Sequence, residues 1–350
     1  MTNASISLAN LEGVHIGGEL QELASFPAVA RAPHPGIPSF DNNGHHMVGQ
    51  MYAQYFWQAV PRSPVPLALW HGGGMTGACW ENTPDNRAGW LNYFLREKFN
   101  VVLCDAFERG RASLPPFPHA VDEAPEFRSI DSVWHHFRFG PLGRFPKELS
   151  APALRAHAYP GLQFPIEQLE QFGRQFAPRF TNTDALIFSA YEAFLKRTGP
   201  CTIVAHSQGA VFALQCALAM PHLVQSVVAL EPPVSQFLLN KLSGADAGDL
   251  PPHLFIWGDF IREKNEIWSP WMANAKRYHE ILAQRGVQSS SIELPSVGIF
   301  GNSHMLQMEA NSQEIAAIVR DWIVNREERG LCADERTADS KSAGKRHSDD

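Results

Sequence analysis

Residues 203–212, IVAHSQGAVF, place a serine where an apolar strand pattern gives way to a helix pattern. The run before Ser207 is β-branched and apolar, which is typical of a buried strand. The run after it is small and apolar, which suits a helix packed closely on a sheet. A sharp turn between them, with small Ala205 and Gly209 on either side, would project the hydroxyl as a nucleophile elbow does. The alternative is a plain turn, because a short SxG pattern is not specific.

A serine hydroxyl is a weak nucleophile at neutral pH unless a base takes its proton, so a histidine should reach it. The chain has 15 histidines. Several of them, including His135, His136 and His157, lie in a stretch without strand ends to position them. His304, in GIFGNSHML, follows the last predicted strand and precedes a helix, so we predict that it is the base. An ordinary loop histidine is the alternative.

The base in turn needs a carboxylate that holds its tautomer and stabilises its protonated form. Two carboxylates end predicted strands. Glu231, in VVALEPP, ends the strand after the helix that follows Ser207, and a buried carboxylate there would need a partner. Asp259, in FIWGDF, ends the next strand and has the commoner alternative role of a turn residue. On the residues alone, the two are nearly equal candidates.

A glycine cluster supplies the remaining element of acyl-transfer chemistry. In WHGGGMTGACW, three glycines follow an apolar run, and unobstructed backbone N–H groups there could approach a developing negative charge. An ordinary glycine-rich turn is the alternative. A phosphate-binding loop is disfavoured, because no Lys-Ser/Thr pair follows the glycines.

Alternating strand and helix patterns must position these residues. A weakly alternating segment at 50–59 is typical of a strand near a sheet edge. Six apolar runs predict further strands, at 65–74, 100–113, 201–209, 226–233, 253–259 and 291–305. Helical spacing appears between most of them, for example at Gly209–Met220, Trp271–Arg285 and Ser312–Arg326. Apolar strands alternating with helices imply an α/β fold with a mostly parallel sheet covered on both faces.

The expected organisation is an N-terminal extension at 1–46, one domain at 47–325 and a disordered polar tail at 326–350. The stretch at about 113–182 lacks strand patterns but is rich in aromatics, prolines and histidines. Because so long an insertion is rarely bare loop, we predict a helical lid over the carboxyl edge of the sheet.

Composition narrows the function classes. The chain of 350 residues has 44% hydrophobic and 19% charged residues, a globular balance. A net charge of −7 argues against a nucleic-acid partner. Five cysteines without a CxxC pair argue against a disulfide framework or a zinc site. No signal peptide or membrane span is recognisable, so we expect a cytoplasmic protein without a membrane partner, or a periplasmic or secreted one whose leader has been removed.

These motifs together resemble the α/β-hydrolase superfamily and, within it, a small group of bacterial carboxylesterases. The resemblance depends on the blocks HGGGMTGACWENTPDNRAGW, FRFGP, AHSQGA, ALEPP and GNSHML, and it covers roughly 47–325. The first block is similar to the HGGG loops of lipases and esterases. Some members of the group carry adjacent cysteines where this chain has Gly73 and Gly74.

The resemblance implies a Ser–His–Glu triad of Ser207, His304 and Glu231, which favours Glu231 over Asp259. It also implies that the amides of Gly73 and Gln208 form the oxyanion hole. The implied reaction is hydrolysis of a carboxylic ester through an acyl-enzyme, without a metal or organic cofactor.

We expect a small apolar ester or related acyl substrate, with Gly74, Trp80 and Trp134 near it, although such aromatics are more often core. A homodimer is left open. Within hydrolases, the same triad could cleave lactones, amides or carbon–carbon bonds. In a different class, the fold could serve as a non-catalytic binding module, against which the intact Ser, His and acid argue.

Overall fold

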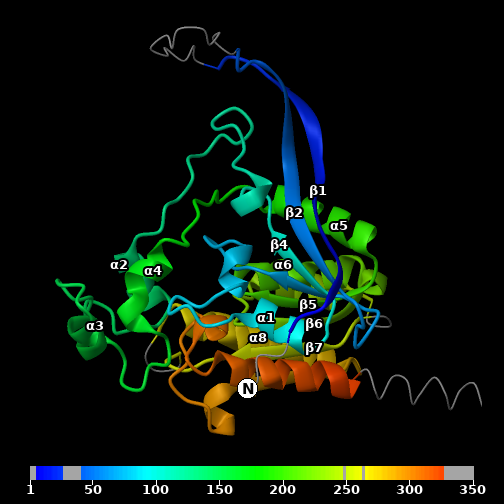
Figure 1. Ribbon diagram of the computed structural model, residues 1–350. Helices are drawn as coiled ribbons and strands as arrows, with labels where there is room; N and C mark the ends of the chain where they lie inside the picture. Colours follow the sequence, from blue (N-terminus) through cyan, green and yellow to red (C-terminus); the bar gives the residue numbers. More distant parts are fainter. Residues whose placement is uncertain (1–4, 27–40, 247–249, 262–264, 327–350) are drawn as a thin grey trace, which may run out of the picture.

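The computed structural model describes residues 5–26, 41–246, 250–261 and 265–326. Its centre is an eight-stranded sheet in the order β1-β2-β4-β3-β5-β6-β7-β8 (Figure 1). The strands are β1 (Leu8–Leu23), β2 (Gly44–Gln58), β3 (Leu67–Trp70), β4 (Val101–Asp105), β5 (Cys201–His206), β6 (Val224–Leu230), β7 (His253–Trp257) and β8 (Ser289–Glu293). Strands β3 to β8 run parallel, whereas β2 is antiparallel to both β1 and β4. The seven strands predicted from the sequence are therefore all present.

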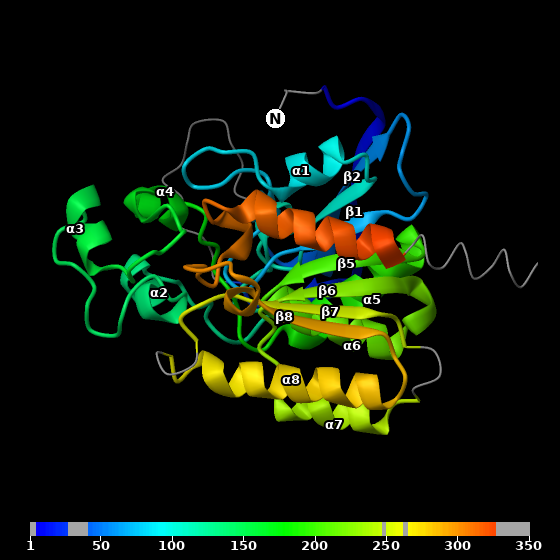
Figure 2. The ribbon, with the colours of Figure 1, turned by 90° about the horizontal axis from the view of Figure 1, so that it is seen from below.

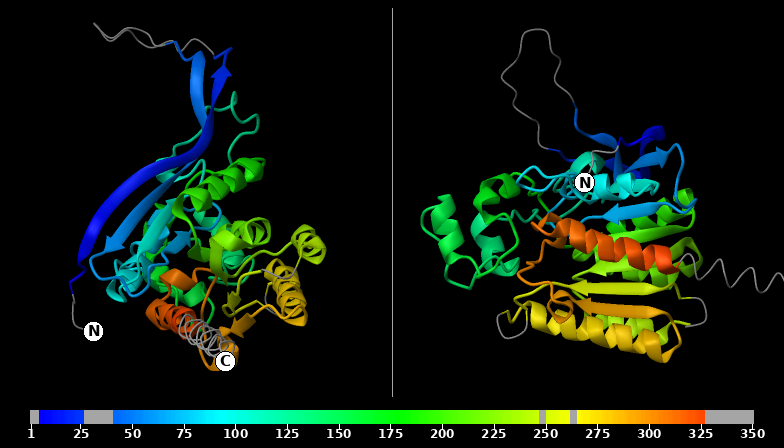
Figure 3. Two further views of the ribbon diagram at one scale, coloured as in Figure 1. Left: turned by 90° about the vertical axis from the view of Figure 1, so that its right-hand side faces the viewer. Right: turned by 60° about the horizontal axis from the view of Figure 1, so that its bottom comes forward.

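Strand β1 corrects the predicted boundary at residue 46. It pairs with β2 along its whole length, from Leu8 opposite Gln58 to Leu23 opposite Gly44. The two strands form the long ribbon that extends beyond the rest of the sheet (Figure 3, left). Most β1 side chains are exposed, so the segment lacks the apolar alternation by which a half-buried strand is recognised. The start of the chain is thus partly an edge strand rather than an extension outside the sheet.

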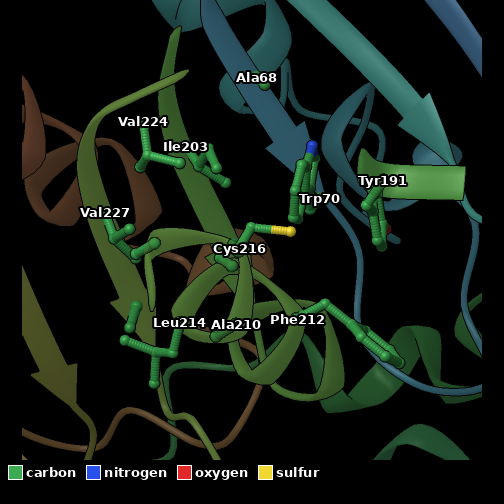
Figure 4. Packing of buried hydrophobic residues seen from close by; sticks show 14 of the residues in the cluster. Ala68, Trp70, Tyr191, Ile203, Ala210, Phe212, Leu214, Cys216, Val224 and Val227 are labelled. Atoms are coloured by element: carbon green, nitrogen blue, oxygen red, sulfur yellow. The ribbon is translucent and has the colours of Figure 1, made fainter. Parts of the chain in front are cut away.

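Successive side chains of the central strands enter two separate hydrophobic clusters. In β5, Ile203 and Ala205 join one cluster and Val204 joins the other. Both faces of the strand are buried, which explains why its sequence is apolar throughout instead of alternating. Figure 4 shows part of the first cluster, where Cys216 points toward Trp70. The Trp70 ring also stacks on Tyr191 at 3.7 Å between centroids.

Helices cover both faces of the sheet (Figure 2). The first cluster contains side chains of α5 (Asp184–Thr198), α6 (Gln208–Ala219), α7 (Gln236–Gly244) and α8 (Trp268–Gln284). The second contains side chains of α1 (Trp90–Arg96) and of the helix at 312–326. The described residues also contain short 3₁₀ turns at Gly77–Trp80, Gly110–Ala112, Ile166–Gln168, Pro221–Leu223, Leu294–Val297 and Leu306–Met308. None of the helices in the described ranges is long and apolar enough to span a bilayer.

The predicted insertion at 113–182 contains short helices and no named strand. Its helices are α2 (Ile130–His136), α3 (Ala151–His157) and α4 (Leu169–Gly173). They gather beside one end of the sheet (Figures 2 and 3). An isolated antiparallel bridge between Glu126 and Arg179 closes the insertion near its base. Its action as a lid stays a prediction, as does the tail, which lies almost entirely outside the described residues.

Candidate active site

Ser207 occupies a strained turn between β5 and α6. Its φ of 52° and ψ of −121° lie where side-chain-bearing residues are rare. Its amide donates to the Leu230 carbonyl of the neighbouring strand, 2.9 Å away. A Cβ atom added at Gly209 would lie 2.4 Å from the His71 carbonyl oxygen, so the close approach of helix and strand requires glycine there. The turn has the geometry expected of a nucleophile elbow.

Glu231 stands at the equivalent point of β6, the next strand of the sheet. Its φ is also positive, at 49°, and its amide donates to the Ile256 carbonyl at 2.9 Å. The side chain is completely buried. Two adjacent parallel strands therefore end in strained, side-chain-bearing residues at the same edge of the sheet, which is where α/β folds hold their ligands.

His304 contacts Glu231 directly. Its Nδ1 lies 2.7 Å from Oε2 of the carboxylate, and both side chains are buried. The backbone amide of His304 donates to the Phe137 carbonyl, and the ring packs against Trp268 at 4.0 Å between centroids. Burial lowers the pKa of His304 well below its usual range, so the imidazole is neutral at neutral pH. A neutral ring is the form that can accept a proton.

Arg138 binds the other side of the same carboxylate. Its guanidinium donates to both oxygens of Glu231 and, through Nε, to the Asp259 carbonyl. The Gly258 amide adds a further hydrogen bond to Oε1 at 2.7 Å. Burial raises the pKa of Glu231, while the guanidinium and the amide favour its ionised form. The carboxylate is thus held in one orientation toward His304 by a fork of two hydrogen bonds.

Asp259, the competing candidate, has structural contacts. Its carboxylate accepts hydrogen bonds from the Phe260 amide at 2.6 Å and the Gly301 amide at 3.1 Å. These contacts tie the turn after β7 to the loop that carries His304. Of the two carboxylates, Glu231 is therefore the one that contacts the imidazole.

The glycine loop after β3 lies against the elbow. A Cβ atom added at Gly72 would lie 3.0 Å from the Ser207 Cβ. His71 fixes this loop: its Nε2 accepts from the Ala106 amide, so Nδ1 must carry the proton that it donates to the Gly72 carbonyl. Within the described part of the chain, the amides of Gly73 and Gln208 donate to no protein acceptor.

One cavity of about 350 Å³ brings these groups together. Ser207, His304, Gly73 and Gln208 all line it. The loop after β3, the elbow, the loop before helix 312–326 and helix α2 each contribute to its wall. A serine hydroxyl, a neutral imidazole and two amide groups without an acceptor among the described residues therefore share one space, which is the arrangement that acyl transfer would require.

The predicted substrate-contacting residues lie elsewhere. Trp80 and Trp134 are buried in the second hydrophobic cluster and do not line this cavity, so that prediction is corrected. Gly74 does not line it either; its φ of +72° and the nearby Arg128 side chain explain the glycine. Two other tryptophans, Trp268 and Trp271 of α8, form the aromatic wall. Trp80 and Trp134 are therefore core residues, which is the more common role of aromatic side chains.

Comparison with solved structures identifies the fold. No protein-family model matches the chain. A solved structure reported as that of "a Novel Bacterial Esterase" superposes with a TM-score of 0.76 and 24% identity, covering 92% of this chain and 97% of that one. The chain has the α/β-hydrolase fold. Its mostly parallel sheet with helices on both faces and an elbow at Ser207 agrees with this assignment.

A curated fungal protein is also similar over most of its length. "Probable secreted lipase phiG", from Fungal sp. (strain ATCC 74256), is 25% identical over 324 residues, which cover 78% of this chain and 85% of that protein. Its name describes secretion of that protein. The cytoplasmic location that we expected for this hydrolase-fold chain stays a prediction.

Two arginines of the insertion complete the cavity and were missed by the sequence reasoning. Arg128 and Arg179 both line it, although 51 positions separate them in the numbering. The backbone bridge between Glu126 and Arg179 brings their segments together. No motif signals such a pairing. Arg138, by contrast, lies in the FRFGP block, and the need of a buried carboxylate for a partner could have pointed to it.

Proposed function

We propose that the protein is a serine hydrolase that cleaves carboxylic esters through an acyl-enzyme, with Ser207 as nucleophile, His304 as base and Glu231 as the orienting acid. The observation that carries the proposal is the 2.7 Å contact between His304 Nδ1 and Glu231 beside the strained Ser207 turn. The names of the bacterial and fungal relatives support an ester as the substrate.

The contacts of His304 support a division of labour between its nitrogens. Nδ1 is engaged by Glu231, so Nε2 is the nitrogen that takes the proton of the Ser207 hydroxyl. The serine oxygen then attacks the ester carbonyl carbon, and the carbonyl oxygen becomes an oxyanion. The unengaged amides of Gly73 and Gln208 stabilise that charge.

Collapse of the tetrahedral intermediate breaks the ester C–O bond. The alcohol leaves with the proton that His304 has held, and the acyl group remains on Ser207. A water molecule gives a proton to His304 as it attacks the acyl carbonyl, and a second collapse releases the acid and restores the serine. Arg138 acts through Glu231, whose orientation it maintains, and not on the substrate.

The same groups could attack a lactone, an amide or a carbon–carbon bond, but no separate observation favours any of these. A non-catalytic module is disfavoured because such a protein would not need a neutral buried histidine with an oriented carboxylate.

Ser207→Ala tests the proposal. With a chromogenic short-chain ester, we expect kcat to fall by about three orders of magnitude or more, because the nucleophile is lost. Ser243→Ala is a matched control, since this exposed serine of α7 lies outside the cavity. Circular dichroism of both variants checks that they are folded. A Ser207→Ala variant that keeps most of its activity would exclude the proposed mechanism.

A further inference from the structure

Two guanidinium groups face the cavity beside the oxyanion loop. Nη1 of Arg179 lies 3.2 Å from the position that a Cβ atom would take at Gly73. Nε of Arg128 lies 2.8 Å from the corresponding position at Gly74. Both side chains line the cavity that contains Ser207. The glycines therefore make room for two arginines immediately next to the proposed oxyanion donors.

Neither arginine forms an ion pair with a residue that the structure describes, although the guanidinium carbon of Arg128 lies 5.2 Å from the centroid of the Phe137 ring. Among the described residues, no carboxylate oxygen lies within 4.0 Å of either guanidinium, and both Nε atoms are buried without an acceptor. Arg109 and Arg138, by contrast, are buried in ion pairs with Glu108 and Glu231. Leaving a partly buried charge without a partner is costly, and such a cost is typical of a binding site.

The carboxylates nearest in the fold do not cancel this charge. Asp184 also lines the cavity, but its carboxylate forms no ion pair with either arginine and instead accepts a hydrogen bond from the Gln208 side chain at 3.3 Å. Glu126 is exposed, and the hydrogen bonds that join it to Arg179 are between backbone atoms. Burial lowers the pKa of Arg128 and the positive charge of Arg179 acts in the same direction, whereas the negative charge of Glu126 partly opposes them. The positive charges of the two arginines therefore repel each other.

We propose that the natural substrate is an ester that carries a carboxylate close to the scissile carbonyl, and that Arg128 and Arg179 bind this carboxylate. The inference rests on the proposed esterase function. Guanidinium groups match the planar carboxylate and bind it with charge-assisted hydrogen bonds. Since Arg179 adjoins Gly73, the carboxylate should lie only a few bonds from the carbon that Ser207 attacks. This replaces the expectation of a purely apolar ester.

Two matched pairs of substrates test the proposal. In the first, the carboxylate is in the acyl part: 4-nitrophenyl hydrogen glutarate against its methyl ester, with the non-enzymatic rates subtracted. In the second, it is in the alcohol part: 3-acetoxybenzoate against its methyl ester. We expect kcat/KM to favour the anionic member of one pair by about tenfold to a hundredfold, as charge-assisted hydrogen bonds do. The preference should weaken as salt concentration rises.

Arginine variants assign the preference to these side chains. Arg128→Gln and Arg179→Gln should each lower kcat/KM for the preferred anionic ester far more than for its neutral partner, mainly through KM. Arg179→Lys should keep part of the preference, because it keeps the charge but not the fork. Arg174→Gln is the control: this exposed arginine of the same insertion contacts Gln171 outside the cavity, so the preference should be unchanged.

The proposal would be overturned by equal rates for both members in both pairs, or by variants that lower both members equally. The second result would mean that the arginines support the glycine loop and do not bind a substrate carboxylate. Neither result would touch the esterase function, which requires only that a neutral ester be hydrolysed in a Ser207-dependent way. Absence of Ser207-dependent hydrolysis for all four esters would instead reject the esterase function.

Discussion

Arg138 and Arg128 come from the same stretch of the chain and reach the same site, but their surroundings are opposite. Arg138 is completely buried and forms two hydrogen bonds with Glu231. Arg128 faces the cavity, where its Nε has no acceptor. The first charge is paired within the protein and orients the proposed catalytic groups. The second has no ion pair with the described residues, and we propose that it binds a ligand. The presence or absence of a carboxylate partner, more than the position in the chain, distinguishes an arginine that orients other side chains from one that we propose binds a ligand.

The paired side is a continuous chain of contacts. Arg138 holds Glu231, Glu231 holds His304, and the His304 amide is anchored on the Phe137 carbonyl next to Arg138. A buried ion pair of this kind gives little net stability, because desolvation offsets the attraction. Its value lies in geometry, since each partner fixes the orientation of the next.

Glu231→Gln should have the largest effect. The amide cannot stabilise a protonated His304 and can hold the wrong tautomer, so kcat should fall by about four orders of magnitude. Asp259→Asn is the matched control, because this carboxylate binds two loop amides and should cost far less. Kinetics with one chromogenic ester compare the two variants.

Both variants must first be shown to be folded, since both residues end strands. An inactive Asp259→Asn together with an active Glu231→Gln would move the acid to the later strand. Arg138 would then orient a carboxylate without a catalytic role, although the assignment of the fold would be unaffected.

Arg138→Met and Arg128→Met should differ in stability. Removal of Arg138 leaves the Glu231 carboxylate buried without its cation, which should lower the free energy of unfolding by about 3–5 kcal/mol. Removal of Arg128 takes away a repelling charge, so the free energy of unfolding should change by no more than about 0.5 kcal/mol or should rise. Urea unfolding measures both. An equal loss of unfolding free energy in both variants would show that the two arginines do not differ in how the protein pairs their charge.

The sequence was sufficient for the parts of the molecule in which chemistry and periodicity coincide. Weak alternation predicted β2, apolar runs predicted β3 to β8, and the abrupt change of pattern at Ser207 predicted the turn found there. Strand β1 was missed because its side chains are mostly exposed and carry no period. The choice between Glu231 and Asp259 was undecided on the residues, because both end apolar strands and only packing brings one to the imidazole.

The arginines illustrate the limit most clearly. Arg128 and Arg179 lie in irregular segments of the insertion, and a backbone bridge that no short motif encodes brings those segments together. Trp80 and Trp134 were assigned to the substrate because aromatics can form apolar pockets, whereas the structure buries them in the core. Side chains on strand ends are predictable from sequence because the fold repeats their position; side chains on insertions are not.

The most direct test of the central claim is covalent labelling of the intact protein with a fluorophosphonate, followed by intact mass measurement and peptide mapping. The probe reacts with a serine only where a base activates it. The account predicts one adduct per chain on Ser207, lost in Ser207→Ala and strongly slowed in Glu231→Gln. An adduct on another residue, or no adduct on a folded protein that hydrolyses esters, would contradict it.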